Sequence, residues 1–148
     1  MSKVSVVRNQ SIPSDKEVFD LVKKSIDLLG GIEEFVKKGD RVALKPNILT
    51  GRVERHGVTT DPRIVEAMIR LCRDAKASEI MVVEGAEYAS ETNEAFVNSG
   101  IKAVIDKHGA KMVDVYNSEL IKLRVPEPLL LKQLEVSKDF VEADVRIN

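Results

Sequence analysis

The sequence contains few of the residues that disulfides, redox clusters and base-stacking surfaces require. Its single cysteine, Cys72, has no partner for an internal disulfide, and an iron–sulfur cluster usually takes four thiolates. Tryptophan is absent and aromatic residues make up 4% of the chain, so a stacking platform for single-stranded nucleic acid is not expected. No cofactor is therefore expected in this chain, and its cysteine usage indicates a reducing, cytoplasmic location.

The sequence also lacks an excess of charge and long apolar runs. The 23 Lys and Arg residues nearly balance the 24 Asp and Glu residues, for a net charge of −1, so nucleic acid is not an expected partner. No apolar run approaches the roughly 20 residues of a membrane helix, and residues 1–10 lack a signal-peptide core. Membrane partners are not expected either. Glutamine is scarce beside abundant Lys and Glu, a bias seen in hyperthermophiles.

The pattern along the 148 residues predicts a single domain, 1–148, in which strands and helices alternate. Ser14 and Glu17 form the signature of a capping box ahead of a helix that ends near Gly30-Gly31, and Asp61-Pro62 opens a second helix. Further helices are predicted over 90–98 (beginning at Ser90 or Glu91), 101–108 and 137–143. Strands are predicted over 4–8, 41–45, 79–84, 111–115 and 145–148, and a hairpin over 120–125 and 129–136.

Near-continuous apolar strands between helices predict a three-layer α/β fold. The expected sheet is mostly parallel, with about five strands, helices on both faces and an added antiparallel hairpin. Ligands bind such sheets beyond the carboxyl ends of the strands, near a topological switch point. The residues that follow each strand are therefore the candidates for a functional site.

Polar residues gather after two strands and before the second helix. They suit an anion, because a lysine charge and the N–H groups of a helix N-terminus both attract phosphate or carboxylate. Glu84 is the candidate acid or base, if burial raises its pKa. No metal site is expected, because neither histidine has a second ligand at metal spacing. The candidate ligand-binding residues are Lys45, Asn47, Thr59, Thr60, Asp61 and Gly85.

Each candidate also has a simpler structural interpretation. Asp61 is most simply a helix N-cap, and Lys45 can extend to solvent at the end of an apolar strand. Gly85 can serve only to relieve a tight turn, and Glu84 can be a surface carboxylate. Cys72, on the apolar face of its helix, is interpreted as an inert core residue.

Three motifs resemble the family known as domain of unknown function 362. They are Lys45-Pro46-Asn47, Gly57-Val58-Thr59-Thr60-Asp61-Pro62 and Glu84-Gly85, followed by a chain end, Ala143-Asp144-Val145-Arg146-Ile147-Asn148, that is similar to the family's Ala-Asp-Val-Ile-Ile-Asn. In the family this last strand continues into a Pro-Lys-x-Lys stretch, whereas this sequence stops at Asn148. The resemblance implies the first part of a longer unit, and many relatives carry cysteine clusters that are absent here. An iron–sulfur cluster would then come only from a missing segment or a partner.

Three functional hypotheses remain open at this point. The chain is an enzyme, or half of one, that binds an anionic small molecule; or it is a non-catalytic accessory domain of an iron–sulfur redox system. In the second case a partner chain or a second copy completes the sheet at Val145–Asn148. The third hypothesis is a truncated, inactive fragment.

Overall fold

The first helix shows how closely local sequence signals match the structure, a computed structural model that describes residues 3–49, 57–86 and 92–148. Helix α1 spans Asp15–Asp27, and the predicted capping box is present. The Ser14 hydroxyl accepts a hydrogen bond from the Glu17 N–H, and the Ser14 N–H donates to the Glu17 carboxylate at 2.8 Å. Beyond the helix, Gly30 and Gly31 take positive φ angles that few other residues tolerate.

A four-stranded parallel sheet forms the centre of the molecule. Its strands are β1 (Arg41–Leu44), β2 (Glu79–Glu84), β3 (Lys111–Asp114) and β6 (Val145–Ile147), in the order β3-β2-β1-β6. The central strands β1 and β2 are almost entirely buried. Both of their faces carry apolar side chains, which requires cover on both sides.

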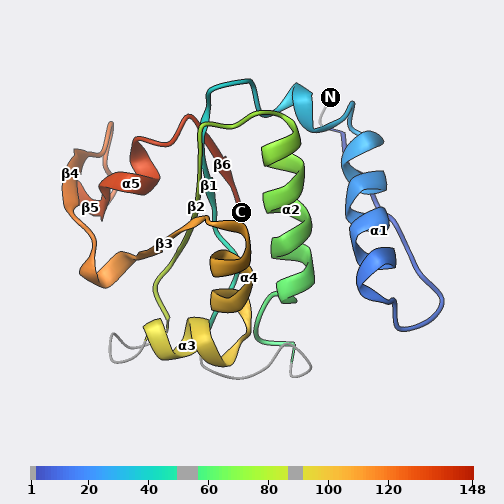
Figure 1. Cartoon of the computed structure of the whole chain (residues 1–148). Helices are drawn as coiled ribbons and strands as arrows, with labels where there is room; N and C mark the ends of the chain where they lie inside the picture. Colours follow the sequence, from blue (N-terminus) through green and yellow to red (C-terminus); the bar gives the residue numbers. More distant parts are fainter. Residues whose placement is uncertain (1–2, 50–56, 87–91) are drawn as a thin grey trace.

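Helices cover one face of the sheet, and a smaller layer covers the other (Figure 1). The first face packs against α1, α2 (Pro62–Asp74), α3 (Thr92–Asn98) and α4 (Ile101–His108). The second face packs against α5 (Lys138–Val141), and beside it lies the hairpin of β4 (Leu120–Arg124) and β5 (Gln133–Ser137). Short 3-10 helices lie at Ile32–Glu34 and Val115–Asn117. The predicted α/β fold with an antiparallel hairpin is therefore confirmed.

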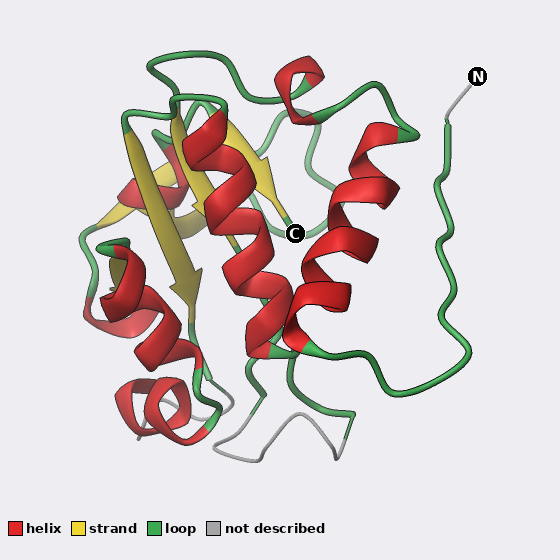
Figure 2. Ribbon diagram, turned by 45° about the vertical axis from the view of Figure 1, so that its right-hand side comes forward, coloured by secondary structure: helices red, strands yellow, loops and turns green. Residues whose placement is uncertain are grey.

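The predicted strand over residues 4–8 is wrong, and the sheet has four strands instead of about five. The segment is extended and runs along the outer side of α1 (Figure 2), where Ser5 Oγ lies 3.1 Å from Ser25 Oγ. Val4 and Val6 are 84% and 83% exposed. A β-branched sequence becomes a strand only where a sheet edge is available to pair with it, and this segment lies against a helix.

The start of the second hairpin strand also differs from the prediction. The second hairpin strand begins at Gln133, and Leu129, Leu130 and Leu131 ahead of it are exposed. In the long loop after β1, an antiparallel bridge joins Ile48, near the start of the loop, to Thr59, near its end. Residues 50–56 of this loop, and the predicted helix start at Ser90 or Glu91, lie outside the described residues.

The order of the strands places a topological switch at β1. From β1 the chain moves through α2 to β2 and through α3 and α4 to β3; it then returns past the hairpin and α5 to β6, on the opposite side of β1. The carboxyl ends of β1 and β6 therefore flank the position at which such sheets usually bind ligands. Over the described residues, no helix has the length and apolarity needed to cross a membrane.

Candidate functional site

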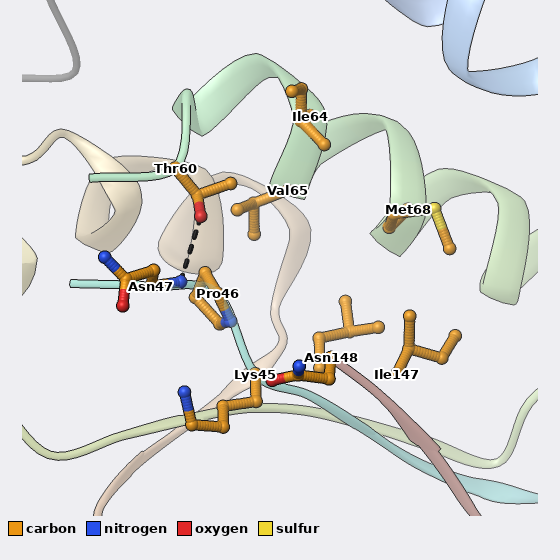
Figure 3. Close-up of a pocket in the computed structure, with 10 residues that line it drawn as sticks. Lys45, Pro46, Asn47, Thr60, Ile64, Val65, Met68, Ile147 and Asn148 are labelled. Carbon is orange, nitrogen blue, oxygen red and sulfur yellow. Dashed lines mark hydrogen bonds between the residues drawn. The ribbon is translucent and has the colours of Figure 1, made fainter. Parts of the chain in front are cut away.

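A pocket of about 420 Å³ opens at this switch point. Strand β1 contributes Leu44 and the three residues that follow it, β6 contributes its last residues, and α2 forms the far wall. In Figure 3 the polar groups of Lys45, Asn47 and Thr60 gather at one end, while Met68 and Ile147 lie at the other. The pocket is lined by Leu44, Lys45, Pro46, Asn47, Thr60, Ile64, Val65, Met68, Ile147 and Asn148.

Among the described residues that line this pocket, Lys45 is the one with a charged side chain. Its Nζ lies 3.1 Å from Oε2 of Glu84, and its side chain is 40% exposed while that of Glu84 is 8% exposed. Glu84 is therefore a buried, ion-paired carboxylate at the end of β2, not a surface one. A buried carboxylate needs such a partner, because leaving its charge unpaired away from water is costly.

Asn47 and Thr60 hold together the two ends of the loop that follows β1. The Asn47 N–H donates to Thr60 Oγ1 at 2.9 Å, and the Thr60 N–H donates to the Asn47 carbonyl at 2.8 Å. The Asn47 side-chain amide donates to the Val58 carbonyl at 2.8 Å. These contacts place both residues in the pocket wall. Thr59 is buried beside them and does not line the pocket.

Asp61 caps α2 and binds Arg63. Its carboxylate accepts from the Arg63 N–H at 2.9 Å and from the guanidinium Nη2 at 2.6 Å. Although partial burial alone raises the pKa of Asp61, these hydrogen bonds and the Arg63 charge hold it below its ordinary value. The N–H groups of Ile64 and Val65 bond to the Asp61 carbonyl. The N–H groups of Arg63, Ile64 and Val65 are thus engaged with Asp61, and Lys45 is the charged side chain that lines the pocket beside Ile64 and Val65.

Gly85 follows Glu84 and makes room for an aromatic ring. A Cβ at this position would lie 3.0 Å from Cε2 of Tyr116 and 3.3 Å from Cβ of Val115. Its φ angle is not positive, so the requirement for glycine here is steric. The absence of a side chain at Gly85 therefore makes space for the Tyr116 ring.

The structure divides the predicted site into two pockets that meet at Lys45. Asn47 and Thr60 line the first with Lys45, whereas Glu84 and Gly85 line a second pocket with Lys45, Tyr116 and Ser137. Sequence reasoning missed Ser137 and Tyr116. Tyr116 follows β3 directly, so the expectation that ligands bind beyond the strand ends could have included it. No local signal marks Ser137, because only the return of the hairpin brings the end of β5 to this pocket. Asp61 lies apart, against the N-terminal segment.

Metal ligation and thiol chemistry find little support in the described residues. Within 3–49, 57–86 and 92–148, no group of three or more His, Cys, Asp and Glu residues could hold a metal ion. Cys72 is fully buried, and burial raises the pKa of its thiol to about 12. The interpretation of Cys72 as a core residue is confirmed.

Comparisons with known proteins agree with the resemblance in the motifs. The chain is 29% identical over 148 residues to the thylakoid-associated protein sll1697 of Synechocystis, and it spans 44% of that protein's length. No solved structure gives a significant match. The family described as domain of unknown function (DUF362) matches residues 42–148, which include β1 from its second residue, α2, the candidate site and β6. The chain therefore belongs to the DUF362 family.

Proposed function

We propose that this chain binds an anionic small molecule, a phosphate or a carboxylate, in the pocket beside Lys45. The observation that carries the proposal is the position of Lys45, the single charged side chain of a pocket at the β1–β6 switch point. Ligands of open α/β sheets bind at such points. A partly exposed ammonium group in a concave site can give up one carboxylate partner for another anion.

The pocket walls suggest how the anion would be oriented. The hydroxyl of Thr60 and the amide groups of Asn47 and Asn148 offer hydrogen bonds, and Ile64, Val65, Met68 and Ile147 offer an apolar surface. A few polar groups among apolar walls are typical of small-molecule sites. The expected ligand is therefore an anionic group attached to an apolar body of modest size.

Glu84 has two roles in this proposal. Its carboxylate neutralises Lys45 at 3.1 Å. With an anion on Lys45 that pairing weakens, and a proton taken from the ligand then neutralises the buried carboxylate. Proton transfer by a buried carboxylate is an established contribution to catalysis. We propose Glu84 as the acid or base of any reaction at this site, without assigning that reaction.

Calorimetric titration of the chain with inorganic phosphate and with succinate tests the proposal. We expect binding that Lys45→Met weakens about tenfold, because a hydrogen bond to a charged group contributes roughly 1.5–3 kcal/mol. Lys24→Met, which removes an exposed lysine of α1, is the matched control and should bind like the unchanged chain. The proposal is refuted if neither phosphate nor succinate binds, or if Lys45→Met binds them as tightly as the unchanged chain does.

A second candidate function rests on the edge of the sheet. Strand β6 pairs with β1 alone among the described strands, so its outer edge can accept a strand from a partner. The chain would then be an accessory domain completed there by another copy or by a chain that brings an iron–sulfur centre. Self-association that Arg146→Pro abolishes in analytical ultracentrifugation would support it. A chain that stays monomeric at every concentration would favour the anion-binding domain. If anions also fail to bind, an inactive fragment would be favoured.

The proposed location is the cytoplasm, from the cysteine usage of the sequence. The Synechocystis relative is by its name thylakoid-associated. Fractionation of cells that produce the chain, with and without a high-salt wash of the membranes, distinguishes the two. Recovery in the membrane fraction after the wash would contradict a cytoplasmic location.

A further inference from the structure

The second pocket, on the other side of Lys45, has a chemistry of its own. It has a volume of about 320 Å³ and lies between the ends of β2 and β3 and the returning segment of β5 and α5. Tyr116 and Phe140 give it aromatic walls, and Glu84 and Glu135 line it with carboxylates. Lys45 is the one cationic side chain of this lining, so its side chains carry a net negative charge, opposite to that of the first pocket.

Ser137 supplies an independent sign that this pocket is built for a ligand. The residue lines the pocket at the junction of β5 and α5 and is 1% exposed. Across the described part of the chain, its Oγ is the buried side-chain polar atom that has no hydrogen-bond partner. Buried hydroxyls are nearly always bonded, and an exception needs a physical explanation. A ligand group provides one if the Ser137 side chain rotates to bring its Oγ to the pocket surface, which the residue lines.

The charges around the pocket indicate which ligand would fit. Glu84 is held by Lys45, whose long and partly exposed side chain also lines the first pocket and can turn into it. Glu135 pairs with Lys122 at 3.6 Å, and both of those side chains are mostly exposed. A protonated amine can therefore replace the Lys45 ammonium on Glu84 and leave the buried carboxylate neutralised. Aromatic walls favour an apolar body and also attract cations.

We propose that this second pocket binds a small organic amine in its protonated form. Glu84 accepts the ion pair, the Ser137 hydroxyl accepts a hydrogen bond from the ammonium group, and the apolar body packs against Tyr116 and Phe140. Lys45 turns toward the first pocket as the amine binds. The inference goes beyond the proposed anion site and does not depend on it, because the amine needs no anion to be present.

Three probes of matched shape test the proposal on the unchanged chain. They are 2-phenylethylamine, the neutral 2-phenylethanol and the anionic 3-phenylpropanoate, titrated calorimetrically in a buffer without phosphate or carboxylate. We expect the amine to bind at least about tenfold more tightly than the alcohol, as a charged hydrogen bond in a buried site allows. Equal affinity for amine and alcohol, or no measurable binding of the amine, overturns the proposal whatever the phosphate titration shows.

Variants then locate the amine. Glu84→Gln should weaken its binding about tenfold, while Glu33→Gln, an exposed glutamate of the 3-10 helix after α1, should leave it unchanged. Lys45→Met removes the competing ammonium and should strengthen amine binding, the opposite of its expected effect on phosphate. A failure of the anion proposal and a failure of this one are therefore separate results.

Ser137→Ala distinguishes a hydroxyl that binds the amine from one with a purely structural role. Removing an unpaired buried hydroxyl should raise the melting temperature of the free chain, whereas loss of its hydrogen bond to the ammonium should weaken amine binding about fivefold. Unchanged amine affinity would overturn the role of Ser137. If a variant fails to fold, the three probes on the unchanged chain still decide the proposal.

Discussion

At the scale of single residues, the chemistry of Cys72 is set by burial. The thiol has no exposed surface, and loss of hydration raises its pKa to about 12. Since the thiolate is the reactive species, the folded chain should react with a disulfide reagent at pH 8 only as fast as it unfolds. Labelling followed by absorbance checks this expectation, and the chain in guanidinium is the control for a reactive thiol. Rapid labelling of the native chain would contradict the buried position.

Gly85 offers a second test at this scale. A methyl group in its place would meet Cε2 of Tyr116 at 3.0 Å, and the half-exposed ring can turn away. Gly85→Ala should therefore cost little stability, about 1 kcal/mol or less, but it should move the ring out of the second pocket. A crystal structure of the variant checks this displacement. A ring in its original place would show that the backbone at Gly85 moved instead.

The individual residues also show which features of the site the sequence predicts. The cap at Asp61 and the core position of Cys72 follow from local patterns and are confirmed by the structure. The ion pair of Lys45 with Glu84 was not predicted, because the sequence does not show which strands are neighbours in the sheet. Ser137 could not be found in this way. Its unpaired hydroxyl results from the path of the hairpin, which is a property of the fold and leaves no periodicity in the sequence.

At the scale of elements, α1 depends on its capping box. Ser14 and Glu17 satisfy each other's backbone N–H groups, which would otherwise be unpaired at the helix start. Ser14→Ala should lower the free energy of unfolding by about 1 kcal/mol. Urea denaturation measures this loss, with Ser11→Ala, an exposed serine of the preceding turn, as the control. Equal stability of the two variants would mean that the box contributes nothing.

The start of α2 should be sensitive to acid through Asp61. Hydrogen bonds from Arg63 hold the pKa of Asp61 below its ordinary value of 3.8, so the folded state binds its proton less readily than the unfolded state. The resulting stability is complete above that value and is lost as the pH falls through the folded pKa. Asp61→Asn keeps a capping oxygen but removes the charge, and should cost about 0.5–1 kcal/mol at pH 7.

Denaturation curves of the unchanged chain and of Asp61→Asn from pH 7 to pH 2 check the sign. The difference in free energy should shrink steadily below the ordinary aspartate pKa and vanish in acid. A difference that stays constant with pH would show that the charge of Asp61 plays no part in stability.

Elements were predicted best where their signals are local. The helices with clear caps and stops, such as α4 between Gly100 and Gly109, have the expected bounds. The segment 4–8 was predicted wrongly, because strand formation requires a partner edge and the sequence does not show where edges lie. The order of strands in the sheet is equally non-local, although the general α/β pattern predicts that ligands bind at the carboxyl ends of the strands.

At the scale of the whole molecule, Lys45 lines both pockets and pairs with Glu84. If the first pocket binds an anion as proposed, Glu84 and that anion compete for one ammonium group. Glu84→Gln removes the internal competitor and should strengthen phosphate binding several-fold, whereas Lys45→Met should weaken it. Calorimetry on both variants checks these opposite effects. Weakened phosphate binding in Glu84→Gln would mean that Glu84 holds Lys45 in place for the anion instead of competing for it.

A phosphate titration of the ¹⁵N-labelled chain followed by NMR tests the anion site most directly. We expect shifts to concentrate on amides around the first pocket, at Lys45, Asn47, Thr60 and Asn148, and we expect Lys45→Met to abolish them. Shifts spread over exposed lysines elsewhere, or an unchanged pattern in Lys45→Met, would contradict the claim that the switch point of this sheet is an anion site.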